Sequence, residues 1–202
     1  MPGGSSDEGA ASVMARFLGE ALRPKTPEEV RRRARADRFG NALLAGGGLW
    51  HTTHPDRYQA ILQTGAILPE PPIPDSERWY AAKGVENGPY VRKLGGVSLF
   101  DFRGFPGWEA FHERYPACSL PYFVPAHSGW GQAVWVEIDR ATVQAAVLSP
   151  GDVLARQKRE GCLRNMVMPG VEAAHIGPLP RSSFRRAFHV DARFGSVRRE
   201  AV

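Results

Sequence analysis

The sequence predicts an α+β fold with a split or mixed β-sheet and an N-terminal helical extension. After residue 49, segments rich in β-branched and aromatic residues outnumber the segments with helical spacing. The two kinds of segment do not alternate regularly, as they would in a doubly wound parallel sheet. The chain has 202 residues, 43% of them hydrophobic, and is therefore long enough to bury one sizeable core.

The N-terminal residues 1–44 are expected to form a flexible leader and a helical extension, ahead of a main domain at residues 45–202. Small and polar residues dominate 1–12 and are typical of disorder, whereas the apolar spacing over 12–22 fits a short amphipathic helix. Thr26, Pro27 and Glu29 supply an N-cap, a proline at the first helical position and a capping-box glutamate. We therefore expect a helix from Pro27 to about Phe39.

The main domain opens with a strand followed directly by a helix. Leu49-Trp50-His51 predicts the first core strand, and residues 55–62 predict a helix that Gly65 ends. A proline-rich loop follows at 69–74. The later segments predict five more strands, at 96–102, 122–125, 133–138, 166–175 and 184–190. Between these strands we expect a helix at 108–115, a short helix or turn at 139–147 and a basic polar loop at 155–163, and the chain ends in a basic tail.

Charge and cysteine content narrow the possible partners and surroundings. The formal net charge of +5 comes mainly from arginines at 31–38, at 155–160 and after residue 181. This balance is compatible with a polyanionic partner such as nucleic acid, but an arginine-rich composition alone is a weak signal. Cys118 and Cys162 form no CxxC motif, and we see no apolar segment typical of a signal peptide or membrane span. We therefore expect a cytoplasmic protein with reduced thiols and no membrane partner.

Common catalytic and metal-binding motifs are missing from the sequence. It contains no phosphate-binding loop, no GxGxxG after a strand, no HExxH and no GxSxG. A zinc site built from His112, Cys118 and His127 fits no tetrahedral spacing pattern, so we expect no metal. Cys118 alone is better explained as a small buried hydrophobic residue.

Three segments nevertheless carry polar residues where a sheet would form a site. They are His51-Thr52-Thr53 at a strand end, Ser98 within the strand at 96–102, and Glu172 in the late strand at 166–175. The stretch LWHTTHPDRYQAILQTGAILP resembles the first core strand and helix of the ADP-ribosyltransferase superfamily. MVMPGVEAAHIGPLP resembles the late strand that carries the glutamate of that superfamily, in the form seen in DarT-type DNA ADP-ribosyltransferases and their uncharacterised bacterial relatives. The resemblance covers about residues 49–190.

This resemblance implies an ADP-ribosyltransferase-like split mixed sheet that binds NAD as co-substrate and transfers ADP-ribose with loss of nicotinamide. Glu172 and His51 would be the catalytic residues. The residues expected to contact NAD are His51, Thr52, Thr53, Gly65, Tyr80, Ser98 and Phe100. Those expected to contact a macromolecular acceptor, with nucleic acid as a candidate, are Arg156, Lys158 and Arg159. A toxin-like or defence role, with an antitoxin as protein partner, belongs to the same family-level expectation.

The chemistry of these residue types agrees with that expectation. Cleavage of the glycosidic bond of NAD develops positive charge on the ribose, which a fixed carboxylate such as Glu172 stabilises. An imidazole at a strand end, here His51, suits a hydrogen bond to a ribose hydroxyl.

The motif positions spell His-Ser-Glu, which differs from the Arg-Ser-Glu and His-Tyr-Glu patterns of the superfamily. Gly170 stands where arginine-modifying toxins carry Gln or Glu, so an arginine acceptor is disfavoured.

Other interpretations of the same residues remain open. His51 is also compatible with a structural strand-end histidine, and Glu172 with a salt bridge to one of the many arginines. Glu137 is the rival carboxylate, but strand alternation places it on the face of Trp135, so we expect it to point to solvent or to an arginine. At the level of the whole protein, the alternatives are an NAD glycohydrolase on the same fold and a non-catalytic nucleic-acid-binding module.

Overall fold

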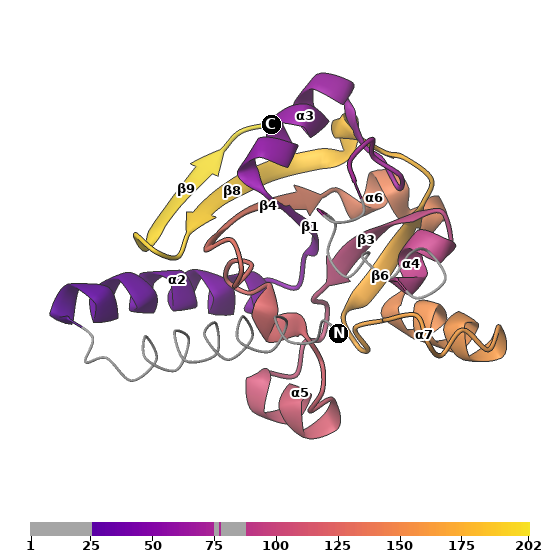
Figure 1. Ribbon diagram of the computed structural model, residues 1–202, viewed down its shortest axis with the longest axis horizontal. Coiled ribbons are helices and arrows are strands. Elements are labelled where there is room, and N and C mark those ends of the chain that lie inside the picture. Colours follow the sequence, from indigo (N-terminus) through magenta and orange to yellow (C-terminus); the bar gives the residue numbers. More distant parts are fainter. Residues whose placement is uncertain (1–25, 75–76, 78–87) are drawn as a thin grey trace, which may run out of the picture.

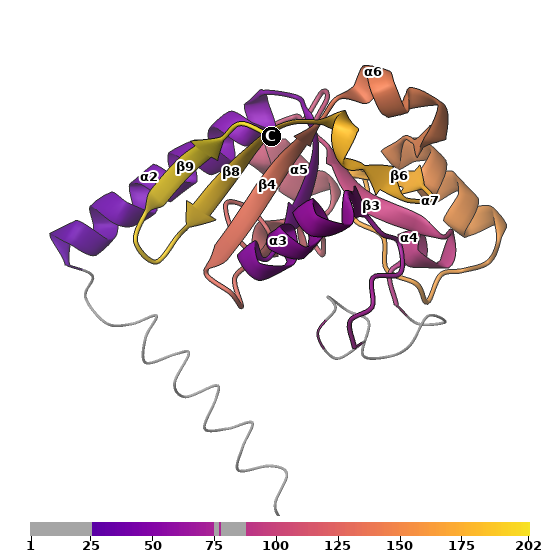
Figure 2. The ribbon, with the colours of Figure 1, turned by 90° about the horizontal axis from the view of Figure 1, so that it is seen from above.

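The computed structural model describes residues 26–74, 77 and 88–202. Two expected segments, the leader at 1–12 and the helix at 12–22, lie outside the described residues, as does Tyr80. The described chain forms an α+β structure around one large sheet, with helices on both of its faces (Figures 1 and 2).

The large sheet has seven strands in the order β5-β6-β3-β1-β4-β8-β9. Their bounds are β1 Leu49–Thr53, β3 Gly96–Asp101, β4 Gln132–Ile138, β5 Val147–Leu148, β6 Glu172–Ile176, β8 Phe184–Asp191 and β9 Ser196–Glu200. All of the neighbouring strands pair antiparallel. The expected mixed sheet is therefore wrong, and the parallel pairing in the described chain is a single bridge between Pro89 and Met166. A second, two-stranded sheet joins β2, Ala66–Ile67, to β7, Leu179–Pro180.

The two faces of the large sheet bury separate hydrophobic clusters under different helices. One face packs against α2, Pro27–Ala45, whose Leu43 and Leu44 join Trp50 and Trp135 in the core. The other face packs against α3, Pro55–Thr64, through the fully buried Tyr58. Figure 2 shows these two helices on opposite sides of β4 and β8. The capping box at Thr26 confirms the predicted start of α2, but this helix runs six residues beyond Phe39 and packs on the sheet.

The remaining helices of the described chain have ten residues or fewer. The α-helices are α4 Tyr90–Lys93, α5 Trp108–Arg114, α6 Arg140–Val143 and α7 Pro150–Arg159, and the 3-10 helices are η3 Leu120–Tyr122, η4 Gln144–Ala146 and η5 Arg181–Ser183. The described part of the chain has no helix with the length and apolar character needed to cross a bilayer.

Three expected elements are wrong or misplaced. The strand predicted at 122–125 is replaced by η3 and a turn, because Pro121 and Pro125 lack the N–H donors that a strand ladder uses. The basic loop predicted at 155–163 is mostly the helix α7, which begins earlier, at a capping box between Ser149 and Asp152. The strand predicted at 166–175 begins only at Glu172.

The last strand, β9, carries no alternating apolar pattern and was not predicted from the sequence. Its five residues include two arginines and a glutamate and lie at the edge of the sheet, with four of the five exposed. Charged side chains are common on edge strands because they oppose pairing with another chain.

Candidate functional site

The site begins where two neighbouring strands of the sheet separate. β1 pairs with β4 along its whole length, from Leu49 opposite Ile138 to Thr53 opposite Val134. On its other side, β1 pairs with β3 only at Leu49–Asp101 and Trp50–Phe100. Beyond Trp50, the imidazole of His51 bridges the gap, and its Nδ1 lies 3.0 Å from the backbone oxygen of Ser98. The side chain thus supplies the hydrogen bond that a continued ladder would have given this carbonyl.

This hydrogen bond fixes the protonation of the His51 ring. A carbonyl oxygen can only accept, so Nδ1 carries the hydrogen and donates it to Ser98. Burial lowers the pKa of His51, although the bond to Ser98 opposes this effect. The ring is therefore neutral near pH 7, and its Nε2 is left as a hydrogen-bond acceptor.

A tight turn sets the position of Glu172 at the first residue of β6. Pro169 and Gly170 occupy the middle of this turn, and the backbone N–H of Glu172 donates to the carbonyl of Met168 at 2.9 Å. Gly170 has a φ of +78°, and a Cβ added there would lie 2.7 Å from the Tyr115 ring. Both the backbone conformation and the lack of space therefore require glycine before the glutamate strand.

The carboxylate of Glu172 is buried and bonded at both oxygens. Its side chain receives the Ser98 hydroxyl at Oε1 and the Met168 backbone N–H at Oε2, both at 2.7 Å. The residue is 2% exposed. Burial raises the pKa of Glu172, while the hydrogen bonds from Ser98 and Met168 partly offset the rise. Within the described chain no arginine pairs with this carboxylate, so the salt-bridge explanation lacks support.

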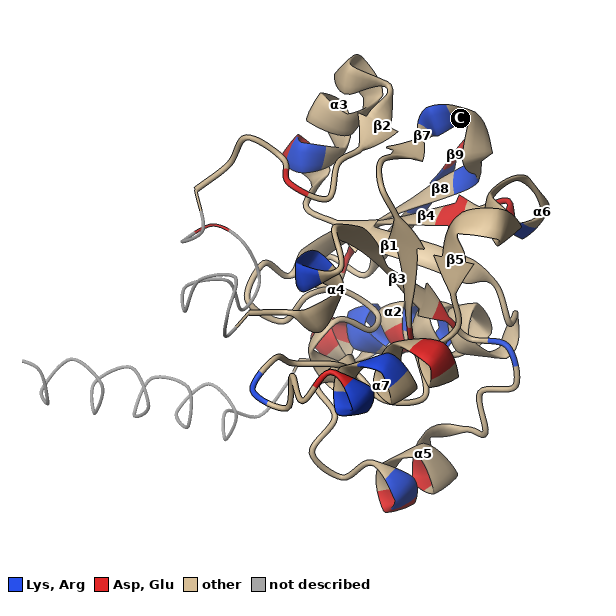
Figure 3. Ribbon diagram, turned by 90° about the vertical axis from the view of Figure 1, so that its right-hand side faces the viewer, with Lys and Arg blue, Asp and Glu red and all other residues tan. Residues whose placement is uncertain are grey.

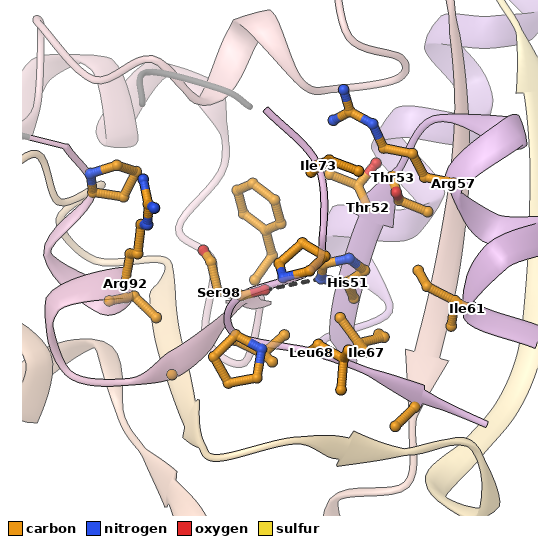
Figure 4. A pocket seen from close by; sticks show the side chains of 18 of the residues that line it. His51, Thr52, Thr53, Arg57, Ile61, Ile67, Leu68, Ile73, Arg92 and Ser98 are labelled. Atoms are coloured by element: carbon orange, nitrogen blue, oxygen red, sulfur yellow. Dashed lines mark hydrogen bonds between the residues drawn. The ribbon is translucent and has the colours of Figure 1, made fainter. Parts of the chain in front are cut away.

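His51, Ser98 and Glu172 all line one cavity of about 460 Å³. Figure 4 shows His51 and Ser98 among the side chains of its wall. This volume lies within the range of small-molecule sites in proteins. Most of its wall is apolar and comes from α3, from the proline-rich stretch 68–73, and from segments 89–97 and 166–168. Three polar groups of this wall, His51, Ser98 and Glu172, are linked by hydrogen bonds at the gap between β1 and β3.

Two arginines of this cavity were not singled out from the sequence. Arg57 lies in the first turn of α3, and Arg92 lies in α4. The guanidinium of Arg92 makes a two-point contact with Glu70, at 2.6 and 2.9 Å. No motif marks either residue among so many arginines, and only the fold brings them to the same cavity.

The residues predicted to contact NAD mostly line the cavity. Thr52, Thr53, Ser98 and Phe100 belong to its wall, together with His51. Gly65 does not; its role is to end α3 in a left-handed conformation with a φ of +75°. Tyr80 lies outside the described residues.

The residues predicted to contact an acceptor lie outside the cavity wall. Arg156, Lys158 and Arg159 occupy the last turn of α7, and Arg156 forms an ion pair with Glu160 at 2.8 Å. Figure 3 shows that α7 carries both basic and acidic residues. The rival carboxylate, Glu137, is bonded to Arg186 and also lies outside the cavity wall, as the strand alternation predicted.

The described residues contain no cluster of three or more His, Cys, Asp or Glu side chains suited to hold a metal ion.

Comparisons of the chain with models of known protein families, with curated proteins and with solved structures found no match.

Proposed function

We propose that this protein is an NAD-dependent ADP-ribosyltransferase in which Glu172 is the catalytic carboxylate. One observation carries the proposal: a chain of hydrogen bonds links His51 to the Ser98 carbonyl and the Ser98 hydroxyl to Glu172, within one cavity. The three residues come from the three motif segments that resemble this superfamily, in the same order along the chain.

The state of Glu172 suits the charge that such a reaction develops. Transfer breaks the bond between ribose C1′ and the nicotinamide nitrogen, nicotinamide leaves with the bonding electrons, and the ribose becomes cationic. A carboxylate held by two donors and shielded from water stabilises this cation strongly, because it needs no reorganisation and little screening occurs. The acceptor then bonds to C1′ and loses a proton, which the same carboxylate can take as a general base.

The remaining polar groups of the cavity fit a ribose. The Nε2 of neutral His51 can accept a hydrogen bond from a ribose hydroxyl. The hydroxyl of Thr52 is buried against the cavity and has no hydrogen-bond partner within the described chain. A buried hydroxyl without a partner is unfavourable, so a ligand that bonds to it gains affinity.

The acceptor is proposed to be a macromolecule, with nucleic acid as the leading candidate. The basic last turn of α7 supports this choice by charge alone, since phosphates attract such a surface. A glycohydrolase would use the same cavity with water as acceptor, and a nucleic-acid-binding module would not cleave NAD.

The test is to incubate the protein with NAD labelled in its adenosine half, together with separate pools of DNA, RNA and protein. Nicotinamide release accompanied by label on one pool supports transfer and identifies the acceptor class. Release without labelled macromolecule indicates a glycohydrolase. If no nicotinamide appears with any pool, the enzymatic proposal fails and the binding-module interpretation gains support.

A further inference from the structure

Arg57 projects from the first turn of α3 at the cavity, on the side of His51 that carries Thr52 and Thr53. Figure 4 shows Arg57 near these two threonines, whereas Ser98 lies on the other side of His51. The guanidinium carbon lies 5.4 Å from the centre of the Trp130 ring, and one guanidinium nitrogen donates to the backbone carbonyl of Glu77. These contacts hold the arginine in place without cancelling its charge.

The two arginines of the cavity differ in how their charge is balanced. The charge of Arg92 is neutralised by the two-point contact with Glu70. Arg57 pairs with no carboxylate within the described part of the chain, and its recorded contacts are the Trp130 ring and a neutral carbonyl. Its positive charge also reaches His127, whose pKa is lowered first by burial and then by Arg57. His127 therefore adds no second positive charge beside Arg57 near pH 7.

We propose that Arg57 is the phosphate anchor of the cavity, so that the ligand is a nucleotide whose diphosphate lies at the α3 end. This inference rests on the proposed function for the identity of the nucleotide. Arginine forks match phosphate oxygens in geometry and charge, and a guanidinium already held against an aromatic ring loses little freedom on binding. The Thr52 hydroxyl, which is buried and has no partner within the described chain, lies at the same end and can bond to the ribose next to this diphosphate.

The placement also orients NAD. Its diphosphate is negative and its nicotinamide ring is positive, while the cavity has Arg57 beyond one side of His51 and the Ser98–Glu172 pair on the other. The favourable arrangement puts the diphosphate near Arg57 and the nicotinamide ribose near Glu172. The bond to be cleaved then lies beside the carboxylate that stabilises its transition state.

The experiment measures the binding of ADP, ADP-ribose and adenosine to the parent protein and to three variants, by calorimetry at two salt concentrations. Arg57→Gln should weaken ADP and ADP-ribose binding about tenfold to a hundredfold and leave adenosine binding nearly unchanged. Arg57→Lys, which keeps the charge, should recover part of the loss. Arg185→Gln, an exposed change on β8, is the matched control for losing one positive charge. Thermal unfolding of each variant checks its fold.

The outcomes separate this inference from the proposed function. If ADP binding depends on Arg57 but the parent releases no nicotinamide from NAD, the phosphate anchor stands and the transferase proposal fails. If the parent releases nicotinamide and Arg57→Gln does so with an unchanged KM, the anchor is refuted and the transferase proposal stands. Equal ADP affinity in the parent and Arg57→Gln, or no binding of ADP to the parent, also overturns the anchor.

Discussion

Replacing Glu172 with glutamine tests the proposed chemistry with little disturbance of the structure. The glutamine has nearly the same volume, and its oxygen can accept the Met168 N–H while its amide donates to the Ser98 hydroxyl. Both hydrogen bonds therefore survive, and only the charge is lost. The matched control is Glu137→Gln, which removes a carboxylate that pairs with Arg186 away from the cavity.

The expected loss of rate follows from removal of one buried electrostatic contributor. Such a change lowers turnover about 10²–10³-fold, while NAD affinity stays near that of the parent because the ground state lacks the ribosyl cation. Glu137→Gln should leave both quantities almost unchanged. In the parent, the raised pKa of Glu172 should also place the acid limb of the pH–rate profile at a higher pH than an ordinary glutamate would.

Glu172→Gln should lower activity but raise the free energy of unfolding relative to the parent. Because the pKa of Glu172 is raised in the folded state, the folded protein binds this proton more tightly than the unfolded chain. The contribution of this proton to the unfolding free energy of the parent is fully present below the ordinary pKa of 4.5, and it is lost as pH rises toward the raised pKa. The slope is at most about 1.4 kcal/mol per pH unit. Glu172→Gln lacks this loss, so its advantage in unfolding free energy should grow across the same pH window.

The assays are nicotinamide release, NAD binding, and chemical unfolding between pH 4.5 and 8. An active Glu172→Gln together with an inactive Glu137→Gln would refute the assignment of the catalytic strand. A Glu172→Gln protein that becomes less stable than the parent as pH rises would contradict the burial argument, because it would mean that the charge stabilises the fold.

Three further predictions use the same measurements. His51→Ala should weaken NAD binding by about 1–3 kcal/mol in a folded protein, and an unchanged NAD affinity would remove His51 from the site. The parent loses stability as pH drops from 6.5 toward the lowered pKa of this histidine, so the unfolding free energy of His51→Ala should fall less steeply over this range. Ser98→Ala removes a hydrogen bond that lowers the pKa of Glu172, so the acid limb of the pH–rate profile should shift to higher pH, and an unshifted limb would argue against this pairing. The last prediction replaces the three basic residues in the last turn of α7, Arg156, Lys158 and Arg159, with alanine. This variant should label a nucleic-acid acceptor less, with a weaker dependence of labelling on salt and an unchanged NAD affinity. An identical salt dependence in variant and parent would exclude this turn as the nucleic-acid contact.

The sequence by itself determined the elements that depend on neighbouring residues. The start of α2 follows from a cap within four residues, and the end of α3 follows from a glycine free to adopt a positive φ. Alternation identified β4 and placed Glu137 away from the cavity. The sequence also selected His51, Ser98 and Glu172, although only as separate segments. It failed at α7 because the cap at Ser149 lies ahead of the basic run that was taken for a loop.

The tertiary structure alone decided how these segments meet. His51 and Ser98 are 47 residues apart and Ser98 and Glu172 are 74 apart, so their contacts depend on the register of β1, β3 and β6. The cavity exists because the β1–β3 ladder stops after two pairs, which no local pattern encodes. The difference between Arg57 and Arg92 likewise depends on Glu70, which lies 22 residues from Arg92 along the chain. Charge balance within a cavity is a property of distances through space, and the sequence lists those charges without their distances.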